Sequence, residues 1–373
     1  MSANLTDGQW KRLLENIDAG SCTALIGAGV YQKISQLKAE VAEDWIKKDG
    51  YPLKDCTEFS RIAQFIAIQN DDQVYPKKTL LEKLKNLEPP DFNKPGEPHD
   101  VLAELELPVY ITTNYDGFMV QALKNRKKDV RRELYRWDKF INDQPSFLRK
   151  GFQPTAANPI VYHLLGHDEV KESLVLTEDD YLKFLLNISK NIEKNVLPSL
   201  IQQVLAQGSL ILVGYQLMDW EFRVLFQGIM ASLDNSLRST SSITIQLSSD
   251  IANNPDKAQE YLSKYFGGVK IKTYVGTTEE FSAELRQRWR SFCFEKPIKS
   301  GVREESTEIQ KSERKNKLIE GFEQFLDVMR DKLLSQIKEY GLETRSEEEI
   351  RQDSRIKVTF EKIELIKSYL DKL

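Results

Sequence analysis

The chain has 373 residues, of which 40% are hydrophobic and 29% are charged, as is typical of a soluble globular protein. Its 53 lysines and arginines stand against 57 aspartates and glutamates, so the net charge of −4 argues against nucleic-acid binding driven by charge alone. Its apolar runs fall short of the roughly 18 residues that cross a bilayer, and the N-terminus lacks a signal pattern. We therefore expect a cytoplasmic protein that binds neither membranes nor specific nucleic-acid sequences.

The three cysteines, Cys22, Cys56 and Cys293, form no CxxC pair. Their wide, irregular spacing does not fit a zinc ribbon or a disulfide framework. We expect each thiol to be a small buried apolar group and the protein to need no metal.

The chain begins with a predicted helix over residues 6–20, followed by a strand over residues 22–26 that runs into Gly27-Ala28-Gly29. Two glycines at the end of a first strand let a phosphate approach the backbone, with the next helix N-terminus pointing at the anion. Position 32 is glutamine, so the GxGxxG fingerprint of ordinary dehydrogenases is absent. The glycine pair is a weak signal for a nucleotide by itself.

Residues 31–98 are interpreted as a helical insert that ends in a proline-rich loop. A short strand from Pro108 then stops in the polar stretch Thr112-Thr-Asn-Tyr-Asp116. Ligands of open α/β sheets bind just past the carboxyl ends of strands, so the amide of Asn114 and the carboxylate of Asp116 can face one ligand. The alternative is an Asx-type turn in which Asp116 caps the next helix.

Residues 117–157 are interpreted as a helix and an irregular segment that could form a lid, and the basic run within them, ending at Arg131-Arg132, as a solvated face. Further strands are predicted at 158–165, 209–213, 242–247 and 269–275, and Thr177 can cap a helix with an acidic first turn. Strands alternating with helices predict a mostly parallel sheet covered by helices on both faces. Four strand ends carry ligand-type residues, and these would meet along one edge.

The chain therefore divides into an α/β domain over residues 1–298, a charged linker at 299–314, and a C-terminal pair of amphipathic helices at 315–373. This C-terminal region carries no catalytic constellation. It either packs on the core or mediates assembly, and we expect it to support a homo-oligomer or the docking of a partner.

The order of these motifs resembles the sirtuin-like proteins of bacterial antiphage defence systems. The resemblance covers roughly residues 20–295 and includes the glycine loop, the stretch around Asn114, the Gly166 strand end with its following LVLTEDDY, and Val213-Gly-Tyr-Gln-Leu-Met-Asp219. It implies a Rossmann-like NAD-binding fold and an NAD-consuming activity that depletes the cofactor in infected cells. A HerA-type ATPase is a possible partner.

The resemblance also implies roles for individual residues. Asn114 matches the asparagine beside the nicotinamide ribose, and Asp116 matches the carboxylate that recognises the carboxamide. Gly27 and Gly29 match the glycines under the pyrophosphate, and Gly214 matches a glycine of the late loop against the adenosine half. Ala28, Thr113 and Tyr215 complete the predicted cofactor-binding set.

Two departures from the family pattern bear on the chemistry. The paired cysteines of the zinc module in deacylating sirtuins are absent, which disfavours protein deacylation. Leu165 stands where the family usually has histidine, with His163 and His167 on either side. His163 shares a strand face with Leu165, so it is our first choice for the base and His167 the second. The alternative for His163 is a buried histidine bonded to the backbone.

The chemistry predicted from this resemblance is NAD hydrolysis to nicotinamide and ADP-ribose. The glycosidic bond breaks through an oxocarbenium-like state, so the protein must orient the ribose and admit or activate one water. The alternative function is a sensor or assembly subunit that binds NAD or ADP-ribose without turnover, and Leu165 favours it.

Overall fold

The computed structural model describes residues 5–53, 58–194, 197–207, 209–215, 242–247 and 270–295, with scattered residues at 257–264 and 330–368. The chain divides into two compact units, residues 1–295 and 296–373. The first unit holds every candidate site residue. In the second, α14 (Glu347–Gln352) begins at a capping box formed by Ser346 and Glu349. The predicted linker and most of the predicted C-terminal helices lie outside the described residues.

The first unit is built on a seven-stranded sheet in the order β3-β4-β2-β1-β5-β6-β7, and every neighbouring pair is parallel. The chain moves outward from β1 to one edge and then returns to the other side of β1 for the last three strands. The ends of β1, β2 and β5 therefore flank the point where the strand order reverses, which is where open α/β sheets bind ligands. The strands are β1 (Cys22–Ile26), β2 (Val109–Thr112), β3 (Arg131–Leu134), β4 (Ile160–His163), β5 (Ser209–Val213), β6 (Ser242–Leu247) and β7 (Lys270–Val275).

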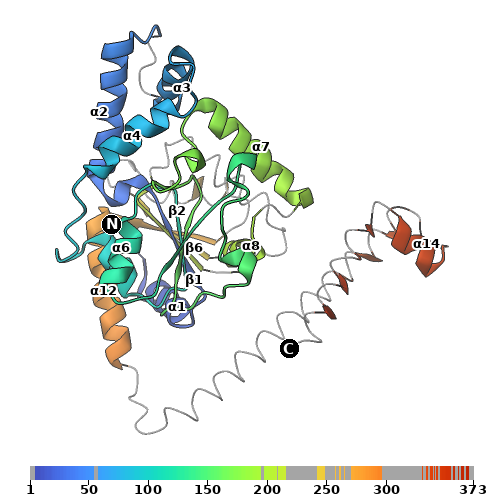
Figure 1. Cartoon of the computed structure of the whole chain (residues 1–373). Coiled ribbons are helices and arrows are strands. Elements are labelled where there is room, and N and C mark those ends of the chain that lie inside the picture. Colours follow the sequence, from blue (N-terminus) through green and yellow to red (C-terminus); the bar gives the residue numbers. More distant parts are fainter. Residues whose placement is uncertain are drawn as a thin grey trace. The chain divides into compact units, whose positions relative to one another are not determined.

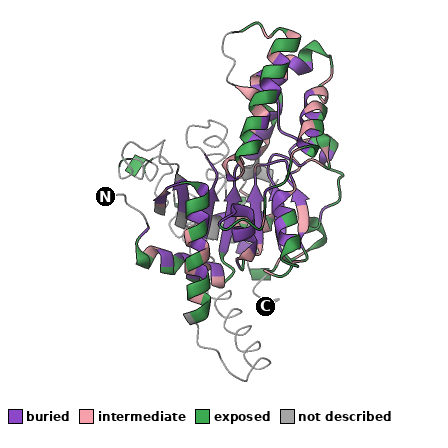
Figure 2. Ribbon diagram, turned by 90° about the vertical axis from the view of Figure 1, so that its left-hand side faces the viewer, coloured by how far each residue is buried: buried purple, intermediate pink, exposed green. Residues whose placement is uncertain are grey.

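Helices cover both faces of the sheet, so each central strand is buried on both sides and reads as an apolar run. On β5, Leu210 and Leu212 belong to one apolar cluster while Ile211 and Val213 belong to the other. Figure 2 shows the strands buried between helices whose outer surfaces are exposed. The apolar cluster on the first face includes side chains of α7 (Glu178–Lys194) and α8 (Ser199–Gln207) and extends to α2 (Gln32–Asp49), α3 (Phe59–Gln69) and α4 (Tyr75–Lys85). The cluster on the second face includes side chains of α1 (Asp7–Asp18), α5 (Pro98–Glu104), α6 (Phe118–Asn125) and α12 (Thr278–Glu295).

The predicted α/β class is confirmed, and most elements fall where the sequence places them. Thr6 and Gln9 form the expected capping box of α1, and Thr177 Oγ1 accepts the amide hydrogen of Asp180 at the start of α7. The predicted insert contains α2, α3 and α4, which stand together at one end of the sheet in Figure 1. Residues 216–241, which include the end of the motif that runs from Val213 to Asp219, lie outside the described residues.

The interpretation of residues 117–157 is wrong in one respect, because this segment contains the edge strand β3. Its four residues, RREL, include no apolar run, since an edge strand pairs on one side only and can carry charge. Short 3₁₀ helices follow at η2 (Lys139–Ile141) and η3 (Leu148–Lys150). The buried Glu133 carboxylate accepts from Ser146 Oγ and Phe147 N and pairs with Arg136, which ties the segment to the sheet. A lid function for the segment stays a prediction.

Among the helices in the described part of the chain, none combines the length and apolar character needed to cross a membrane.

Candidate active site

The strand ends that carry the candidate residues lie in one row of the sheet. Thr112 pairs in register with Ile26 on one side and with His163 on the other. The row continues to Leu134 beyond His163 and to Val213 beyond Ile26. Each candidate segment starts directly after this row, so the structure brings together the segments that follow β1, β2, β4 and β5.

Glycines bring the ends of β1 and β5 into direct backbone contact. Gly27 N–H donates to Val213 O at 2.9 Å, and Gly29 N–H donates to Gly214 O at 2.8 Å. A Cβ on Gly27 or Gly29 would lie 2.5 or 2.9 Å from Gly214 O, so only glycine fits this junction. The backbone N–H of Ala28, in the same turn, has no acceptor among the described residues. The two glycine amides assigned to a phosphate are therefore already used within the fold.

Thr113 and Tyr215 belong to the same junction. Thr113 N–H donates to Ile26 O at 3.1 Å, and its hydroxyl lies 3.5 Å from the hydroxyl of Tyr215. Tyr215 is buried, and its ring lies 2.8 Å from the place where a Cβ on Gly27 would be. Both side chains thus stabilise the meeting of β1, β2 and β5 beside the glycine turn.

Asn114 is fixed at three points. Its backbone N–H donates to Thr112 Oγ1 at 3.0 Å, and its backbone carbonyl lies 2.9 Å from His163 Nδ1. The side-chain Nδ2 donates to Gly27 O at 3.1 Å. Because the Gly27 carbonyl oxygen can only accept, the side-chain nitrogen of Asn114 and not its oxygen must face it, which settles the orientation of the side-chain amide. The Oδ1 atom accepts no hydrogen bond from the described residues, so Asn114 offers one free acceptor.

Asp116 combines the Asx turn and the ligand-type carboxylate that the sequence left as alternatives. Its Oδ1 accepts from Phe118 N at 2.9 Å, which closes a turn before α6. The residue is 6% exposed, and its buried Oδ2 has no hydrogen-bond partner within the described structure. Burial raises the pKa of this carboxyl. An unpaired oxygen in such a place is costly unless a ligand or a proton satisfies it.

A small cavity lies against this turn, with about 10 Å³ in which the centre of a water molecule can move, or room for roughly one water. The turn contributes Asn114, Tyr115 and Asp116, and Lys38 of α2 holds its ammonium 5.3 Å from the centre of the Tyr115 ring. Apolar side chains of α2 and α4 complete the lining, namely Ile34, Leu37, Leu80 and Leu84. The cavity thus has apolar walls, one carboxylate and one cation.

His163 is bonded at both ring nitrogens. Its Nδ1 lies 2.9 Å from Asn114 O, and its Nε2 lies 3.1 Å from Arg132 Nε. The ring is 1% exposed. Burial, with Arg132 and His167 nearby, holds the pKa of His163 well below its usual range. This is the geometry of a buried histidine bonded to the backbone, the alternative weighed for this residue.

His167 has a different environment. Its Nδ1 accepts from Glu169 N at 3.3 Å, and the described residues give its Nε2 no hydrogen bond. Burial, with Arg132 and Arg136 adding positive charge, lowers the pKa of His167 to about 3. Its backbone is fixed, because Gly166 turns with φ +88° and His167 N–H donates to Ser173 Oγ at 3.0 Å. His167 therefore presents a neutral imidazole that carries its hydrogen on Nε2, and this N–H has no acceptor among the described residues.

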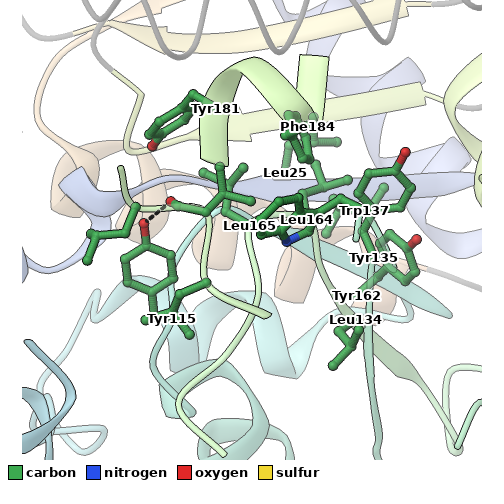
Figure 3. Packing of buried hydrophobic residues seen from close by; sticks show 14 of the residues in the cluster. Leu25, Tyr115, Leu134, Tyr135, Trp137, Tyr162, Leu164, Leu165, Tyr181 and Phe184 are labelled. Carbon is green, nitrogen blue, oxygen red and sulfur yellow. Dashed lines mark hydrogen bonds between the residues drawn. The ribbon is translucent and has the colours of Figure 1, made fainter. Parts of the chain in front are cut away.

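Leu165 occupies the position at which the family usually has histidine. It is 5% exposed and packs in the apolar cluster that also contains Tyr115, Tyr181 and Phe184 (Figure 3). Its carbonyl accepts from Val175 N at 2.9 Å. The side chain is thus part of the core.

Two polar residues that the sequence analysis missed also support the site. Arg132 on β3 contacts the ends of β2 and β4, and its side chain is 13% exposed, so our interpretation as a solvated face is wrong for it. Gln246 on β6 accepts from Gly214 N at 3.3 Å and donates to Gly276 O at 2.8 Å. No sequence motif marks either residue, because the groups that each one contacts belong to strands that are distant in sequence.

The residues that the structure describes contain no group of three or more His, Cys, Asp or Glu side chains that could hold a metal ion. Cys22 is buried and Cys293 is exposed, which corrects the expectation that each thiol is buried. Cys293 lies near the end of α12, far from any other cysteine in sequence. Cys56 lies outside the described residues.

The fold and the row of polar strand ends define a Rossmann-like α/β protein with a candidate ligand site at the point where the strand order reverses. Residues 108–269 match the model of the SIR2-like domain. The chain thus carries a SIR2-like match over this stretch, in agreement with the family that the motifs indicated.

Two curated proteins are similar to the chain. It is 26% identical over 179 residues to the NAD(+) hydrolase ThsA of Enterococcus faecium, an alignment that covers 47% of this chain and 34% of that protein. It is 25% identical over 133 residues to the NAD(+) hydrolase ThsA of Acinetobacter baumannii (strain 532279), covering 36% of this chain and 24% of that protein. The chain thus matches about a third or less of the length of these relatives.

Proposed function

We propose that the protein is an NAD glycohydrolase that cleaves NAD to nicotinamide and ADP-ribose. The observation that carries this proposal is a pair of acceptor oxygens, Asn114 Oδ1 and Asp116 Oδ2, that have no partner among the described residues and belong to the turn that lines the small cavity. Both residues stand at the motif positions that the resemblance assigns to the nicotinamide ribose and the carboxamide. The names of the two curated relatives support the same activity.

In the proposed reaction the bond between ribose C1 and the nicotinamide nitrogen breaks, and the electron pair leaves with the now neutral nicotinamide. Water adds to C1, and its proton passes to a base. Asn114 Oδ1 can accept a hydrogen bond from a ribose hydroxyl or from that water. Asp116 Oδ2, which burial favours in its neutral form, can accept from or donate to the carboxamide. An oxocarbenium-like C1 reacts readily with a water that is held in the right place. A weak base is therefore enough to take up the proton of that water.

For the base we favour His167. Its only lone pair in the neutral ring is on Nδ1, where a single hydrogen bond of 3.3 Å from Glu169 N engages it, whereas both nitrogens of His163 are engaged at 2.9 and 3.1 Å. A pKa of about 3 keeps the imidazole of His167 unprotonated at neutral pH. His163 therefore enters the proposal as a supporting residue.

A cavity with room for about one water cannot enclose a dinucleotide, so we propose that NAD enters when α2 and α4 move away from the Asn114 turn. The amide of Ala28 and the ammonium of Lys38 are the groups near this turn that could meet phosphate oxygens. Thr113, Gly214 and Tyr215 would then shape the floor beneath the nucleotide rather than bind it through free backbone amides.

The second candidate function is the binding of NAD or ADP-ribose without turnover, in a sensor or assembly subunit. The observation that favours it is Leu165, a core leucine at the usual position of the histidine. The two functions share a binding site and differ only in chemistry.

The deciding experiment incubates the purified protein with NAD, alone and with candidate activators, and measures nicotinamide release. Asn114→Ala is the site variant, and Asn93→Ala in the exposed loop before α5 is the control. We expect Asn114→Ala to abolish cleavage while the protein melts as a folded domain. If wild-type protein binds NAD calorimetrically but releases no nicotinamide under any condition, the sensor function replaces the hydrolase.

We further propose that the activity serves antiphage defence by NAD depletion, and that residues 315–373 support a homo-oligomer or a partner such as a HerA-type ATPase. Deleting this region should lower the mass measured by light scattering. An unchanged oligomer that still responds to its trigger would contradict the assembly role.

A further inference from the structure

Arg132 joins the ends of two strands that carry the candidate site. Its Nη2 donates to the backbone carbonyls of Tyr115 and Asp116 at 3.2 and 3.1 Å, at the end of β2. Its Nε donates to His163 Nε2 at 3.1 Å, at the end of β4. The guanidinium also forms ion pairs with Asp168 at 2.7 Å and Glu169 at 3.2 Å. One side chain from an edge strand thus holds both loops together.

These contacts fix the protonation of His163. Asn114 O can only accept, so His163 Nδ1 must carry the hydrogen. Arg132 Nε can only donate, so His163 Nε2 must be unprotonated. The imidazole is therefore the neutral Nδ1–H tautomer, and the low dielectric around it and the adjacent guanidinium both oppose a second proton.

The resulting chain of hydrogen bonds runs from Arg132 through His163 to the backbone carbonyl of Asn114. That carbonyl is one of the three points that hold Asn114, beside Thr112 Oγ1 and Gly27 O. If the peptide at this point turned, the side chain of Asn114 would turn with it. The orientation of the Asn114 side-chain amide therefore depends on the ring of His163 and the guanidinium of Arg132.

We propose that Arg132 and His163 form a positioning pair that orients the Asn114–Asp116 turn, and that neither residue exchanges a proton in the reaction. The proposal rests on the function proposed above and assigns it two supporting residues. Such supporting hydrogen bonds around metal ligands commonly change function by about 10- to 100-fold when removed, and we expect a similar range here.

The first test is the protonation of His163, read by ¹⁵N NMR of histidine-labelled protein. The chain has three histidines, so single substitutions assign every signal. We expect His163 to keep a protonated Nδ1 and an unprotonated Nε2 from pH 8 to pH 5. In Arg132→Ala the Nε2 signal should move and titrate at a higher pH. A His163 that titrates near its ordinary pKa of about 6.5 in the wild type would overturn the proposal.

Arg131→Ala is the matched control for Arg132→Ala. Both residues lie on β3, but the Arg131 guanidinium pairs with Asp129 at the surface, with Nη2 at 2.8 Å from Oδ2. We expect this control to leave the histidine signals and NAD cleavage unchanged. Arg132→Lys keeps the positive charge beside Asp168 but loses the forked donors of the guanidinium. It replaces Arg132→Ala if that variant does not fold, and we expect it to weaken cleavage as well.

The second test compares His163→Asn with His163→Ala. The amide nitrogen of asparagine can take the place of Nδ1 and donate to Asn114 O, but asparagine cannot act as a base. A positioning role predicts that His163→Asn keeps kcat within about 10-fold of wild type while His163→Ala loses about 100-fold. Equal, complete losses in two folded variants would make His163 the base and overturn the proposal.

The outcome can be separated from failure of the proposed function. If wild-type protein never cleaves NAD, the hydrolase proposal fails, and ADP-ribose affinity measured by calorimetry replaces kcat as the readout. Arg132→Ala and His163→Ala should then weaken binding about 10-fold or more, with Arg131→Ala unchanged. Unchanged affinity in both folded variants would overturn the positioning pair.

Discussion

The rings of His163 and His167 lie with their centres 5.2 Å apart and their planes at 64°, yet their hydrogen bonds differ. His163 is bonded through both nitrogens, whereas His167 Nε2 has no partner among the described residues. A proton acceptor needs a lone pair that substrate or water can reach, and in the neutral ring of His167 that lone pair is on Nδ1, engaged only by the 3.3 Å hydrogen bond from Glu169 N. The pair thus separates a supporting histidine from a candidate base.

His167→Gln should therefore reduce NAD cleavage by about 100-fold or more, the usual range for removal of a general base. The control is Lys171→Ala, an exposed side chain on the 3₁₀ helix η4 (Lys171–Ser173) that follows the His167 turn. Nicotinamide release under activating conditions is the measurement, with thermal melting as the check on folding. If both variants cleave NAD at the wild-type rate, Asn114 and water alone must carry the reaction.

The pH dependence of stability should also carry the signature of His167. Its folded pKa is lowered to about 3, below an unfolded value of about 6.5, so the unfolded chain takes up a proton that the folded chain refuses as the pH falls. Stability is therefore lost between pH 6.5 and 3. From pH 7.5 to 5.5, wild type should lose about 1.4 kcal/mol more of its unfolding free energy than His167→Gln.

Urea unfolding at the two pH values measures this difference. Asp116, whose pKa is raised by burial, and His163, whose pKa is lowered, are common to both proteins and cancel in the comparison. If wild type and His167→Gln lost the same amount of unfolding free energy between pH 7.5 and 5.5, His167 would titrate normally in the folded protein.

Gly166→Ala should be strongly destabilising. A Cβ at this position would lie 2.2 Å from Ser173 O, and the backbone φ of +88° already disfavours a side chain. Gly151 has a similar φ of +79° but open space around it, so Gly151→Ala isolates the cost of the left-handed backbone, about 1–2 kcal/mol. We expect Gly166→Ala to cost at least about 2 kcal/mol more, because the backbone cannot yield. Equal melting temperatures would mean that the turn relaxes freely.

The contact between the helical insert and α7 should be a major source of stability. Lys77 Nζ of α4 lies 2.9 Å from Asp180 Oδ2, with both side chains less than a tenth exposed, and Lys77 lies over the Trp137 ring at 5.4 Å. Lys77→Met would leave a buried carboxylate without its cation, which typically costs about 3–5 kcal/mol.

Lys78→Met is the neighbouring control. Lys78 pairs with Asp72 at 3.3 Å, and both side chains are well exposed, so its loss should cost less than about 1 kcal/mol. Chemical unfolding of the two variants tests the contrast. Similar small losses would show that water reaches the Lys77 pair.

Local patterns in the sequence determined six of the seven strands of the sheet, all but the edge strand β3. The buried strands at 22–26 and 209–213 are continuous apolar runs, and the polar residues that follow each strand mark the functional edge without any knowledge of their neighbours. Motif order was also enough to indicate the SIR2-like match over residues 108–269, because it depends on residue types at fixed places along the chain.

The tertiary structure alone decided which of these residues has a free functional group. His163 and His167 look equivalent in sequence, but a guanidinium on β3 and a carbonyl after β2 occupy both nitrogens of the first. Arg132 was interpreted as a solvated charge because a charged four-residue edge strand has no pattern of its own. Hydrogen-bond partners of a buried group come from strands far apart in the chain, so their identity is fixed only when the sheet brings those strands side by side.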